Sequence, residues 1–587
     1  MIGIKQFLGF ALLAPKSKRA STASSTGHVH LITTLFSVVS LLLMSATVSA
    51  QSQLGKDING EAAYDESGWS VSMSSTGNRL AIGAQSNDGN GFDSGHVRVY
   101  QWSGTAWEQL GDDIDGEASY NDSGWSVSMS ANGDRLAIGA PDNDGSGFSS
   151  GHVRVYQWSG TDWEQLGDDI DGESAYDYFG VSVSMSSDGK RLVIGGNGND
   201  GNGFDSGHVR VFQWSGTTWE QLGDEINGEA AYDESGRSVS MSSDGNHLAI
   251  GARGNDGNGL NSGHVRVFKW SGVAWVQLGD DINGEAFGDE FGWSVSLAPD
   301  GGRLAVGGPF NINNSGINAG HVRVFQWSGA AWIQLGQDID GEAAYDESGG
   351  SVSLASDGNR LVIGATENDG SGLNAGHARV YQWSGTTWEQ LGTDINGETA
   401  EDSSGNSVSI STDSNRLAIG ARWNDGNGPD SGHVRVYDLS LFNNFTINPG
   451  LNDAWYNPLT DGQGFFITVF PDLNVVSLAW FTYDTELPPE DAQANLGDPG
   501  HRWFTAIGPI TGNQVRMNIE MTSGGLFDTA TEITRTDPPG SDGTIILTFN
   551  GCNSGSVEYD IPSINRHNVV PIRRVANDNI VICEALK

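Results

Sequence analysis

Residues 69–84 read Trp-Ser-Val-Ser-Met-Ser-Ser-Thr-Gly-Asn-Arg-Leu-Ala-Ile-Gly-Ala, and residues 95–102 read Gly-His-Val-Arg-Val-Tyr-Gln-Trp. The alternation of polar and apolar residues over 69–74 is typical of a β-strand. Because Thr76-Gly77-Asn78 is a turn signal, a second strand is predicted at 79–84. A third strand is predicted at 96–102, and a fourth begins at Trp107. The unit is therefore predicted to be a sheet of four antiparallel strands.

This unit recurs seven times with a period of about 56 residues. The valine of Ser-Val-Ser falls at 71, 127, 183, 239, 295, 352 and 408. The histidine of Gly-His-Val-Arg-Val falls at 96, 152, 208, 264, 321, 377 and 433, the sixth copy reading Gly-His-Ala-Arg-Val. Seven four-stranded units predict an all-β fold, a seven-bladed β-propeller over residues 51–442.

The two ends of the repeat array complement each other. The piece Gln-Leu-Gly, which belongs to the fourth strand, starts at Gln53, before any first strand. The last repeat stops after its third strand, at Tyr437, and has no fourth. We therefore expect the N-terminal segment to supply the outer strand of the seventh blade, because this pairing closes the ring and removes exposed sheet edges. An open solenoid would require polar end caps instead.

The composition excludes several classes of partner. The chain carries 83 glycines, 73 acidic and 30 basic residues, giving a net charge of −43 and a pI of about 4.3. Such a surface repels phosphate backbones and anionic lipids, so we expect no binding to nucleic acid. No cofactor is expected, and a monomer is predicted.

Residues 1–50 have the features of a secretory signal peptide. Basic residues at Lys16, Lys18 and Arg19 precede an apolar run over 31–48, which ends in Val48-Ser49-Ala50. An uncleaved membrane anchor is the alternative. After cleavage no segment is expected to insert into a membrane. The protein is therefore expected to be secreted, periplasmic or displayed on the cell surface.

Residues 443–587 differ in composition from the repeats. They contain strand-like aromatic stretches at 464–470, 475–483, 502–504, 544–549 and 580–583, which predict a small β-sandwich or barrel domain. The two cysteines, Cys552 and Cys583, lie here, and in an exported chain an even pair predicts one disulfide. Two buried free thiols are the alternative.

The repeats resemble the FG-GAP repeats of the integrin α-subunit propeller and its bacterial relatives. The resemblance rests on Phe179-Gly180-Val181-Ser182-Val183, on Phe291-Gly292-Trp293-Ser294-Val295 and on the strand 187–195 that follows the first of them. It covers about residues 53–440. Calcium-binding members carry a long acidic loop between the first and second strands, whereas this chain has only a short turn, so that family's calcium ligands have no counterparts here.

The C-terminal region also has a resemblance. Ala454-Trp455-Tyr456-Asn457-Pro458, with 462–464 and 478–483, resembles an uncharacterised domain appended to exported proteins of proteobacteria. That resemblance implies the envelope of a Gram-negative bacterium and supplies no activity.

Two sets of connections are expected on one face of the ring, those from second to third strand and those from fourth strand to the next blade. Both are acidic, so we expect this face to be negatively charged and to bind the ligand. Calcium is one candidate ligand because the first set offers hard oxygen donors. These are Asp88, Asn90, Asp93, Asp144, Asp200, Asp256, Asp369 and Asp425. Turn formation is the alternative role.

Residues that break the repeat pattern are further candidates for ligand binding. Arg237 replaces a Trp, Gly or Asn, and Arg253, Trp423, Tyr178, Glu401 and Asp402 change their own loops. Neutral drift between copies is the alternative. The pair His96 and Arg98 recurs in every repeat, which indicates a structural role in hydrogen bonds to neighbouring loops.

No catalytic constellation is visible in the sequence. We therefore expect an exported, non-enzymatic scaffold that binds protein or glycan through its acidic face. A propeller enzyme acting on polysaccharide, a hydrolase or a lyase, is the first alternative, and it requires an acid/base pair at the mouth of the central channel. A calcium-stiffened adhesion protein is the second.

Overall fold

A computed structural model describes most of the chain after residue 50. The described residues are 51–440, 447–458, 464–483, 501–511, 513–520, 522–523, 534–535, 543–549, 551–562, 566–576, 579–584 and 586. The predicted signal peptide lies outside them. Among the residues described, no helix is long and apolar enough to cross a membrane.

The first blade shows how the repeat folds. Its strands are β3 (Ser70–Met73), β4 (Arg79–Ala84), β5 (His96–Trp102) and β6 (Trp107–Gln109), each antiparallel to the next. Strand β4 is buried on both faces, which explains its nearly continuous apolar run, whereas β5 alternates polar and apolar residues although its first five residues are buried. The four strands predicted from the repeat are confirmed.

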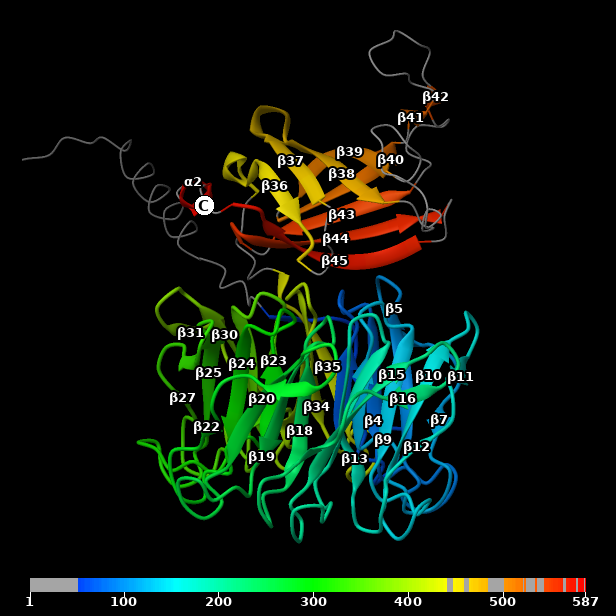
Figure 1. Ribbon diagram of the computed structural model, residues 1–587, viewed down its shortest axis with the longest axis vertical. Helices are drawn as coiled ribbons and strands as arrows, with labels where there is room; N and C mark the ends of the chain where they lie inside the picture. Colours follow the sequence, from blue (N-terminus) through cyan, green and yellow to red (C-terminus); the bar gives the residue numbers. More distant parts are fainter. Residues whose placement is uncertain are drawn as a thin grey trace, which may run out of the picture. The chain divides into compact units, whose positions relative to one another are not determined.

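The other blades repeat this sheet with the same order of strands (Figure 1). Their strands are, in chain order, β8 (Ser126–Met129), β9 (Arg135–Ala140), β10 (His152–Trp158), β11 (Trp163–Gln165); β13 (Phe179–Met185), β14 (Arg191–Gly196), β15 (His208–Trp214), β16 (Trp219–Gln221); β18 (Ser235–Met241), β19 (His247–Ala252), β20 (His264–Trp270), β21 (Trp275–Gln277); β23 (Ser294–Leu297), β24 (Arg303–Gly308), β25 (His321–Trp327), β26 (Trp332–Gln334); β28 (Ser348–Leu354), β29 (Arg360–Ala365), β30 (His377–Trp383), β31 (Trp388–Gln390); and β33 (Ser404–Ile410), β34 (Arg416–Ala421), β35 (His433–Asp438).

Each blade has one piece of strand that the sequence did not predict. In the first blade β7 (Ile114–Asp115) pairs with the N-terminal half of β5, on the same edge of β5 as β6. The outer edge of the sheet therefore consists of two short strands. The others are β12 (Ile170–Asp171), β17 (Ile226–Asn227), β22 (Ile282–Asn283), β27 (Ile339–Asp340) and β32 (Ile395–Asn396). These pieces lie in acidic connections, and the buried isoleucine of each anchors the chain to the sheet.

The N-terminal segment closes the ring as predicted. Strands β1 (Ser52–Gln53) and β2 (Ile58–Asn59) are the outer strands of the seventh blade, where Gln53 pairs with Tyr437 and Ile58 with Val434. One apolar cluster combines Ile58, Leu80 and Ile82 with Val434 and Val436 of the last blade. The first and seventh blades therefore share a core.

Neighbouring blades are joined by hydrogen bonds as well as by apolar packing. The hydroxyl of Ser70 donates to the carbonyl of Gly124 at 2.7 Å, and the amide of Met129 donates to the hydroxyl of Ser72 at 3.0 Å. Gly83 packs against Gly124 so closely that a Cβ there would lie 2.1 Å from its carbonyl oxygen. The serines and glycines of the inner strands are thus needed for close contact between blades.

The C-terminal region forms a closed barrel of eight strands, drawn in yellow to red in Figure 1. Its order is β36 (Asp453–Tyr456), β37 (Gly464–Phe470), β38 (Val475–Tyr483), β39 (His501–Thr511), β40 (Gln514–Glu520), β43 (Thr544–Phe549), β44 (Ser554–Ile561) and β45 (Arg566–Arg574). Short elements flank it: β41 (Thr522–Ser523), β42 (Thr534–Arg535), and the 3-10 turns η2 (Pro449–Leu451) and η3 (Pro471–Leu473). Of the two predicted forms, sandwich or barrel, the barrel is present.

A disulfide joins Cys552 to Cys583, as predicted. Both cysteines are buried, and Cys583 lies in the short helix α2 (Ile580–Glu584). The prediction of a strand at 580–583 was therefore wrong. The amide of Cys583 donates to the carbonyl of Asn579 at 3.0 Å, so the apolar residues serve one helical turn that packs on the barrel core.

Removing this disulfide should destabilise the barrel. The cysteines are 31 residues apart, and a cross-link of that length is worth about 3.5 kcal/mol of unfolding free energy in the chain-entropy account. Calorimetry of the Cys552→Ser/Cys583→Ser variant should show part of the unfolding transition at a lower temperature. A reducing agent should produce the same shift in the wild-type protein and none in the variant.

Candidate binding face of the propeller

Two sets of loops meet on one face of the ring, as the sequence predicted. Gly95, at the end of the loop from β4 to β5, forms a parallel bridge with Ser123, which precedes the next blade. The amide of Tyr120 donates to the carbonyl of Phe92 at 2.8 Å, so the tips of both loops are also joined. We call this surface the loop face.

Exposed apolar side chains form a pair where the tips of the two loops meet. Phe92 is 58% and Tyr120 62% exposed, with ring centroids 5.4 Å apart and planes tilted by 59°. The rings of Phe148 and Tyr176, and of Phe204 and Tyr232, are 5.4 and 5.5 Å apart. Related contacts join Leu260 to the Phe287-Gly288 loop, Ile317 to Tyr345, Leu373 to Glu401 and Pro429 to Tyr64. We call these seven contacts the rim pairs.

The tyrosines of the rim pairs have an unusual backbone conformation. Tyr64, Tyr120, Tyr176, Tyr232 and Tyr345 all lie in the left-handed region, with φ between 63° and 70°. A bulky side chain is disfavoured there, and glycine is the residue that this conformation favours. The fifth repeat has glycine at this place, Gly288, with φ of 76°. A strained tyrosine that is also exposed in five repeats points to a role outside the fold.

The centre of the ring contains a cavity of about 570 Å³. A serine and a valine from the inner strand of every blade line it, from Ser70 and Val71 to Ser407 and Val408. It is therefore the central channel of the propeller. Trp69, Trp125, Arg237, Trp293 and Asn406 line it at the start of the inner strands, where these strands leave the loop face.

The repeats differ most from one another at this mouth of the channel. The position of Trp69 is occupied in the seven copies by Trp, Trp, Val, Arg, Trp, Gly and Asn. The position of Gln85 is occupied by Gln, Pro, Asn, Arg, Pro, Thr and Arg. The adjoining Ser70, Val71 and Gly83 are the same in all or nearly all copies. Seven similar blades thus surround a mouth whose side chains differ from blade to blade.

One side of the mouth combines two arginines with a tryptophan. The guanidinium groups of Arg237 and Arg253 lie 4.9 and 4.6 Å from the ring centre of Trp293. Arg253 also pairs with Glu234 at 2.7 Å and with Glu290 at 3.5 Å. Burial, together with the charge of Arg253, lowers the pKa of Arg237 to about 10, so Arg237 stays charged at neutral pH.

Another side combines Arg422 with carboxylates and rings. Arg422 lies 4.6 Å from the ring centre of Trp69 and 4.3 Å from that of Trp423. Burial and the charge of Glu367 raise the pKa of Glu347 to about 7, and Arg422 opposes this shift. Burial also raises the pKa of Glu367, and both carboxyl groups line the channel. These groups form the acid/base candidate that an enzyme would need.

A second carboxyl group with a strongly raised pKa lies on the loop face. Burial and the neighbouring Asp142 raise the pKa of Asp122 to about 7, so the carboxyl group of Asp122 is partly protonated near neutral pH. The position of Asp122 in its repeat is that of Glu347, and Asp142 occupies the position of Glu367. Two blades therefore present the same arrangement of paired carboxyl groups.

The residues suggested as calcium ligands are placed within the turns of the loop face. Asp88 accepts a hydrogen bond from the amide of Asp93 at 2.9 Å, and the amide group of Asn90 donates to the carbonyl of Gly116 at 2.9 Å. In the other repeats the backbone amide five residues after the aspartate donates the equivalent hydrogen bond. The acceptors are Asp144, Asp200, Asp256, Asp369 and Asp425. One oxygen of each of these aspartates is thus used by its own turn. Calcium binding there stays a prediction.

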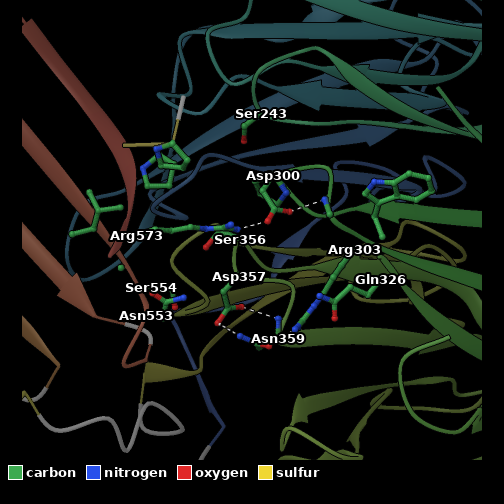
Figure 2. A pocket seen from close by; sticks show the side chains of 17 residues that line it. Ser243, Asp300, Arg303, Gln326, Ser356, Asp357, Asn359, Asn553, Ser554 and Arg573 are labelled. Atoms are coloured by element: carbon green, nitrogen blue, oxygen red, sulfur yellow. Dashed lines mark hydrogen bonds and ion pairs between the residues drawn. The ribbon is translucent and has the colours of Figure 1, made fainter. Parts of the chain in front are cut away.

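The turns between first and second strands lie at the other end of the blades. In Figure 2, Asp300 and Asp357 are shown with the hydrogen bonds that they accept from their own turns. The amide of Gly302 donates to Asp300 at 2.8 Å, and that of Asn359 donates to Asp357 at 2.9 Å. These short turns take the place of the acidic calcium loop of the integrin-like repeats.

The pattern-breaking residues are not all in one place. Arg253 and Trp423 lie at the channel mouth, and Tyr178 occupies the position of Glu347 in its own repeat, with φ of 51°. Glu401 takes the tyrosine position of a rim pair. Asp402 is 1% exposed and accepts bonds from the amides of Glu398 and Thr399, both at 2.8 Å, so it caps a turn. The carboxylate of Asp402 is therefore engaged within its own turn.

The repeated histidine and arginine differ in their contacts. Arg98 donates to the carbonyl of Asn59 at 2.8 Å, which is the predicted bond to a neighbouring loop. His96 is 1% exposed, and among the residues that the structure describes its Nε2 has no hydrogen-bond partner. Burial and the charge of Arg98 lower the pKa of His96 to about 4, so its imidazole is neutral at pH 7.

Sequence reasoning missed the rim pairs. The tyrosines were visible as the recurring Ala-Ala-Tyr-Asp, but the loops were interpreted through their acidic residues. The signal that could have found them is the recurrence of one aromatic residue in a polar loop, at a spacing shared with Phe92, Phe148 and Phe204.

The comparisons with known proteins agree with the fold. The FG-GAP repeat family matches residues 59–100, 170–212, 227–268 and 396–437, so four of the seven repeats are FG-GAP repeats. No curated protein sequence matches the chain.

Several solved structures are similar to part of the chain. A putative 6-phosphogluconolactonase from Bacteroides uniformis shares 12% identity, with 56% of this chain and 85% of that chain covered and a TM-score of 0.38. The periplasmic gluconolactonase of Pseudomonas aeruginosa shares 17%, with 58% and 90% covered and a TM-score of 0.37. The Dos1 propeller shares 14%, with 66% and 96% covered and a TM-score of 0.39.

Proposed function

We propose that this protein is an exported binding scaffold without catalytic activity, which holds a neutral polysaccharide on the loop face of its propeller. The observation that carries the proposal is the set of exposed rim tyrosines in a strained conformation. A side chain that neither fills the core nor suits its backbone is best explained by contact with a partner. The disulfide fits export, because such bonds persist in oxidising compartments.

The chemistry of the rim pairs suits a sugar. An exposed ring of tyrosine offers an apolar face and a hydroxyl group, and sugars present C–H faces together with hydroxyl groups. Carboxylates and amides of the adjoining turns, such as Asp88 and Asn90, can accept and donate hydrogen bonds at the edge of the sugar. The net charge of −43 disfavours polymers of uronic acids, so the expected ligand is neutral.

The repetition of the site suits a polymer. Seven rim pairs on one rigid ring can contact several residues of one chain, and linked weak contacts raise the overall affinity without any new interaction. Arginine, tryptophan and carboxylate at the channel mouth provide a further, central contact. A small soluble sugar should therefore bind much more weakly than the polymer from which it derives.

Replacing the rim tyrosines with glycine tests this proposal without endangering the fold. The variant replaces all five tyrosines with glycine, the residue that the fifth repeat already has at this position, Gly288. Its substitutions are Tyr64→Gly, Tyr120→Gly, Tyr176→Gly, Tyr232→Gly and Tyr345→Gly. We expect the thermal midpoint to stay within a few degrees, because glycine relieves the left-handed strain. In native gels cast with a soluble β-glucan, xylan or pullulan, the wild-type protein should be retarded by one of them.

The variant should migrate in that gel as if the polysaccharide were absent. The matched control is Val273→Ala, which removes an exposed side chain from a turn of the other face and should leave the retardation unchanged. Equal retardation of the five-tyrosine variant and wild type would contradict the proposal. Retardation by alginate alone would overturn the choice of a neutral ligand. If the protein binds another protein and no glycan retards it, the ligand of the loop face is a protein.

A second candidate function is hydrolysis of a polysaccharide, favoured by Glu347 and Glu367. Both line the channel, and Glu347 has a pKa of about 7, as a general acid near neutral pH requires. A paired carboxylate would serve as base or nucleophile. If wild-type protein releases reducing ends from a retained polysaccharide and Glu347→Gln abolishes this release, the protein is an enzyme. No release by either protein supports the scaffold.

A further inference from the structure

A cluster of one histidine and two carboxylates recurs around the propeller, outside the loop tips and the channel mouth. The named groups are Glu61, His96 and Asp113; Glu117, His152 and Asp169; Glu173, His208 and Glu225; Glu229, His264 and Asp281; and Glu398, His433 and Asp57. In each, one ligand atom per residue lies within 4.8 Å of the others. The remaining repeats carry Glu285, His321 and Asp338, and Glu342, His377 and Asp394.

The second blade shows the geometry of the cluster. The Nδ1 atom of His152 lies 3.9 Å from Oε2 of Glu117 and 3.9 Å from Oδ2 of Asp169. These distances are too long for hydrogen bonds. They are about half an ångström longer than the separation of two ligands on one zinc ion, since each bond to the metal is about 2.0–2.2 Å. The two carboxylate side chains are partly exposed, so a shift of this size is possible.

Each carboxylate is held by its other oxygen. Oε1 of Glu117 faces the guanidinium of Arg154 at 3.7 Å, and Oδ1 of Asp169 accepts from the side-chain amide of Gln165 at 2.7 Å. One oxygen of Asp169 is therefore fixed by a hydrogen bond and one oxygen of Glu117 faces a cation, while the other oxygen of each lies 3.9 Å from the imidazole nitrogen. Outer partners that orient metal ligands in this way are typical of metal sites.

In two of the blades the histidine is buried and its Nδ1 atom has no hydrogen-bond partner within the described part of the chain. These are His208, which is 0% exposed, and His377, which is 1% exposed. A buried polar atom without a partner costs about 1–3 kcal/mol. An imidazole nitrogen without such a partner is able to provide the lone pair that a metal ion needs.

The repeats preserve the whole arrangement although its carboxylates are partly exposed. Histidine, glutamate, arginine and glutamine occupy their places in all seven copies, and the remaining place is aspartate in six and glutamate in one. In the same loop the residues two and three places after the glutamate change between copies, to Ser or Phe and to Gly or Glu. Exposed carboxylates would be expected to vary in the same way if they had no shared task.

We propose that each blade binds one divalent transition-metal ion of the zinc type through Nδ1 of its histidine, one oxygen of the glutamate and one oxygen of the aspartate or glutamate. An imidazole ligand favours zinc over calcium or magnesium, which take oxygen ligands. Three protein ligands leave a position for water. In the seventh blade the aspartate is Asp57, so there the ion would join the N-terminal segment to Glu398 and His433 of the last blade.

Native mass spectrometry of the chain from residue 51 counts the ions directly. After chelation and addition of Zn²⁺, we expect the most heavily loaded species in the spectrum to carry seven ions. The thermal midpoint of the protein should rise as well. Asp169→Asn removes one ligand of the second site, so this variant should bind at most six ions. Asp168→Asn is the matched control, because Asp168 is the exposed neighbour of Asp169 and belongs to none of the named clusters. This variant should bind seven ions.

The result that overturns the proposal is equally direct. Equal ion counts in Asp169→Asn and Asp168→Asn, or displacement of Zn²⁺ by an equal concentration of Ca²⁺, would show that ions bind only to the general acidic surface. A shift of the thermal midpoint with Zn²⁺ that Asp169→Asn and Asp57→Asn leave unchanged would lead to the same conclusion.

Discussion

Deleting residues 51–59 should unfold the propeller at a much lower urea concentration than the wild type. The deletion removes β1 and β2, the buried side chain of Ile58, and the bond from the amide of Leu54 to the carbonyl of Val436 at 2.7 Å. The buried side chain of Ile58 alone is worth about 1.5–3 kcal/mol, before the partly buried Leu54 and the loss of the strand pairing are counted. The free edge of β35 should also promote association between molecules.

The deletion can be checked by complementation. A synthetic peptide of residues 51–61, added to the deleted protein, should restore part of the lost stability, because the pairing partner of β35 is then present again. Ser52→Ala is the control, since Ser52 is exposed in β1 and its side chain has no part in the core. A deleted protein with the urea midpoint of the wild type would contradict closure of the ring by the N-terminal segment.

Replacing Trp293 with asparagine should weaken binding of the retained polysaccharide on the order of 100-fold, because truncating a central aromatic residue of a binding site costs about 2–4 kcal/mol. Trp293 lies at the mouth of the channel, where its replacement removes the ring that the guanidinium groups of Arg237 and Arg253 both contact. The measurement is the polysaccharide concentration that half-retards the protein in native gels.

Asparagine is chosen because the seventh repeat has it at the same position, Asn406, so the blade is able to accept it. The thermal midpoint should therefore change little, whereas the half-retarding concentration rises. If the variant is retarded as strongly as the wild type, the channel mouth takes no part in binding and the rim pairs alone hold the polysaccharide. Arg237→Gly, which copies Gly350 of the sixth repeat, is the corresponding test of the charge.

Much of the fold could be predicted because the sequence repeats it seven times. The period located the blades, and the displaced Gln-Leu-Gly at Gln53 was enough to predict the closing strand, since a ring has no other place for it. Strands at Arg79–Ala84 and His96–Trp102 have the predicted bounds. The two-residue strands such as β7 were missed because their pattern is too short to show alternation.

The candidate site was only partly predictable. The two acidic sets of loops were placed on one face, but the pairing of Phe92 with Tyr120 depends on how their two loops meet in space. Arg237, Arg253 and Trp423 were found as departures from the repeat, and the structure adds that Arg237 and Arg253 share the ring of Trp293. The histidine clusters could not be predicted, because most join residues that lie about 35 and 17 positions apart and the seventh joins the two ends of the repeat array.

Hydrogen–deuterium exchange in the presence of the retained polysaccharide tests the central claim most directly. We expect slower exchange in the loops of the binding face, residues 85–95 and 116–125 and their equivalents, and unchanged exchange in the turns of the other face, such as residues 103–106. Protection confined to those turns or to residues 453–574 would contradict binding through the loop face of the propeller.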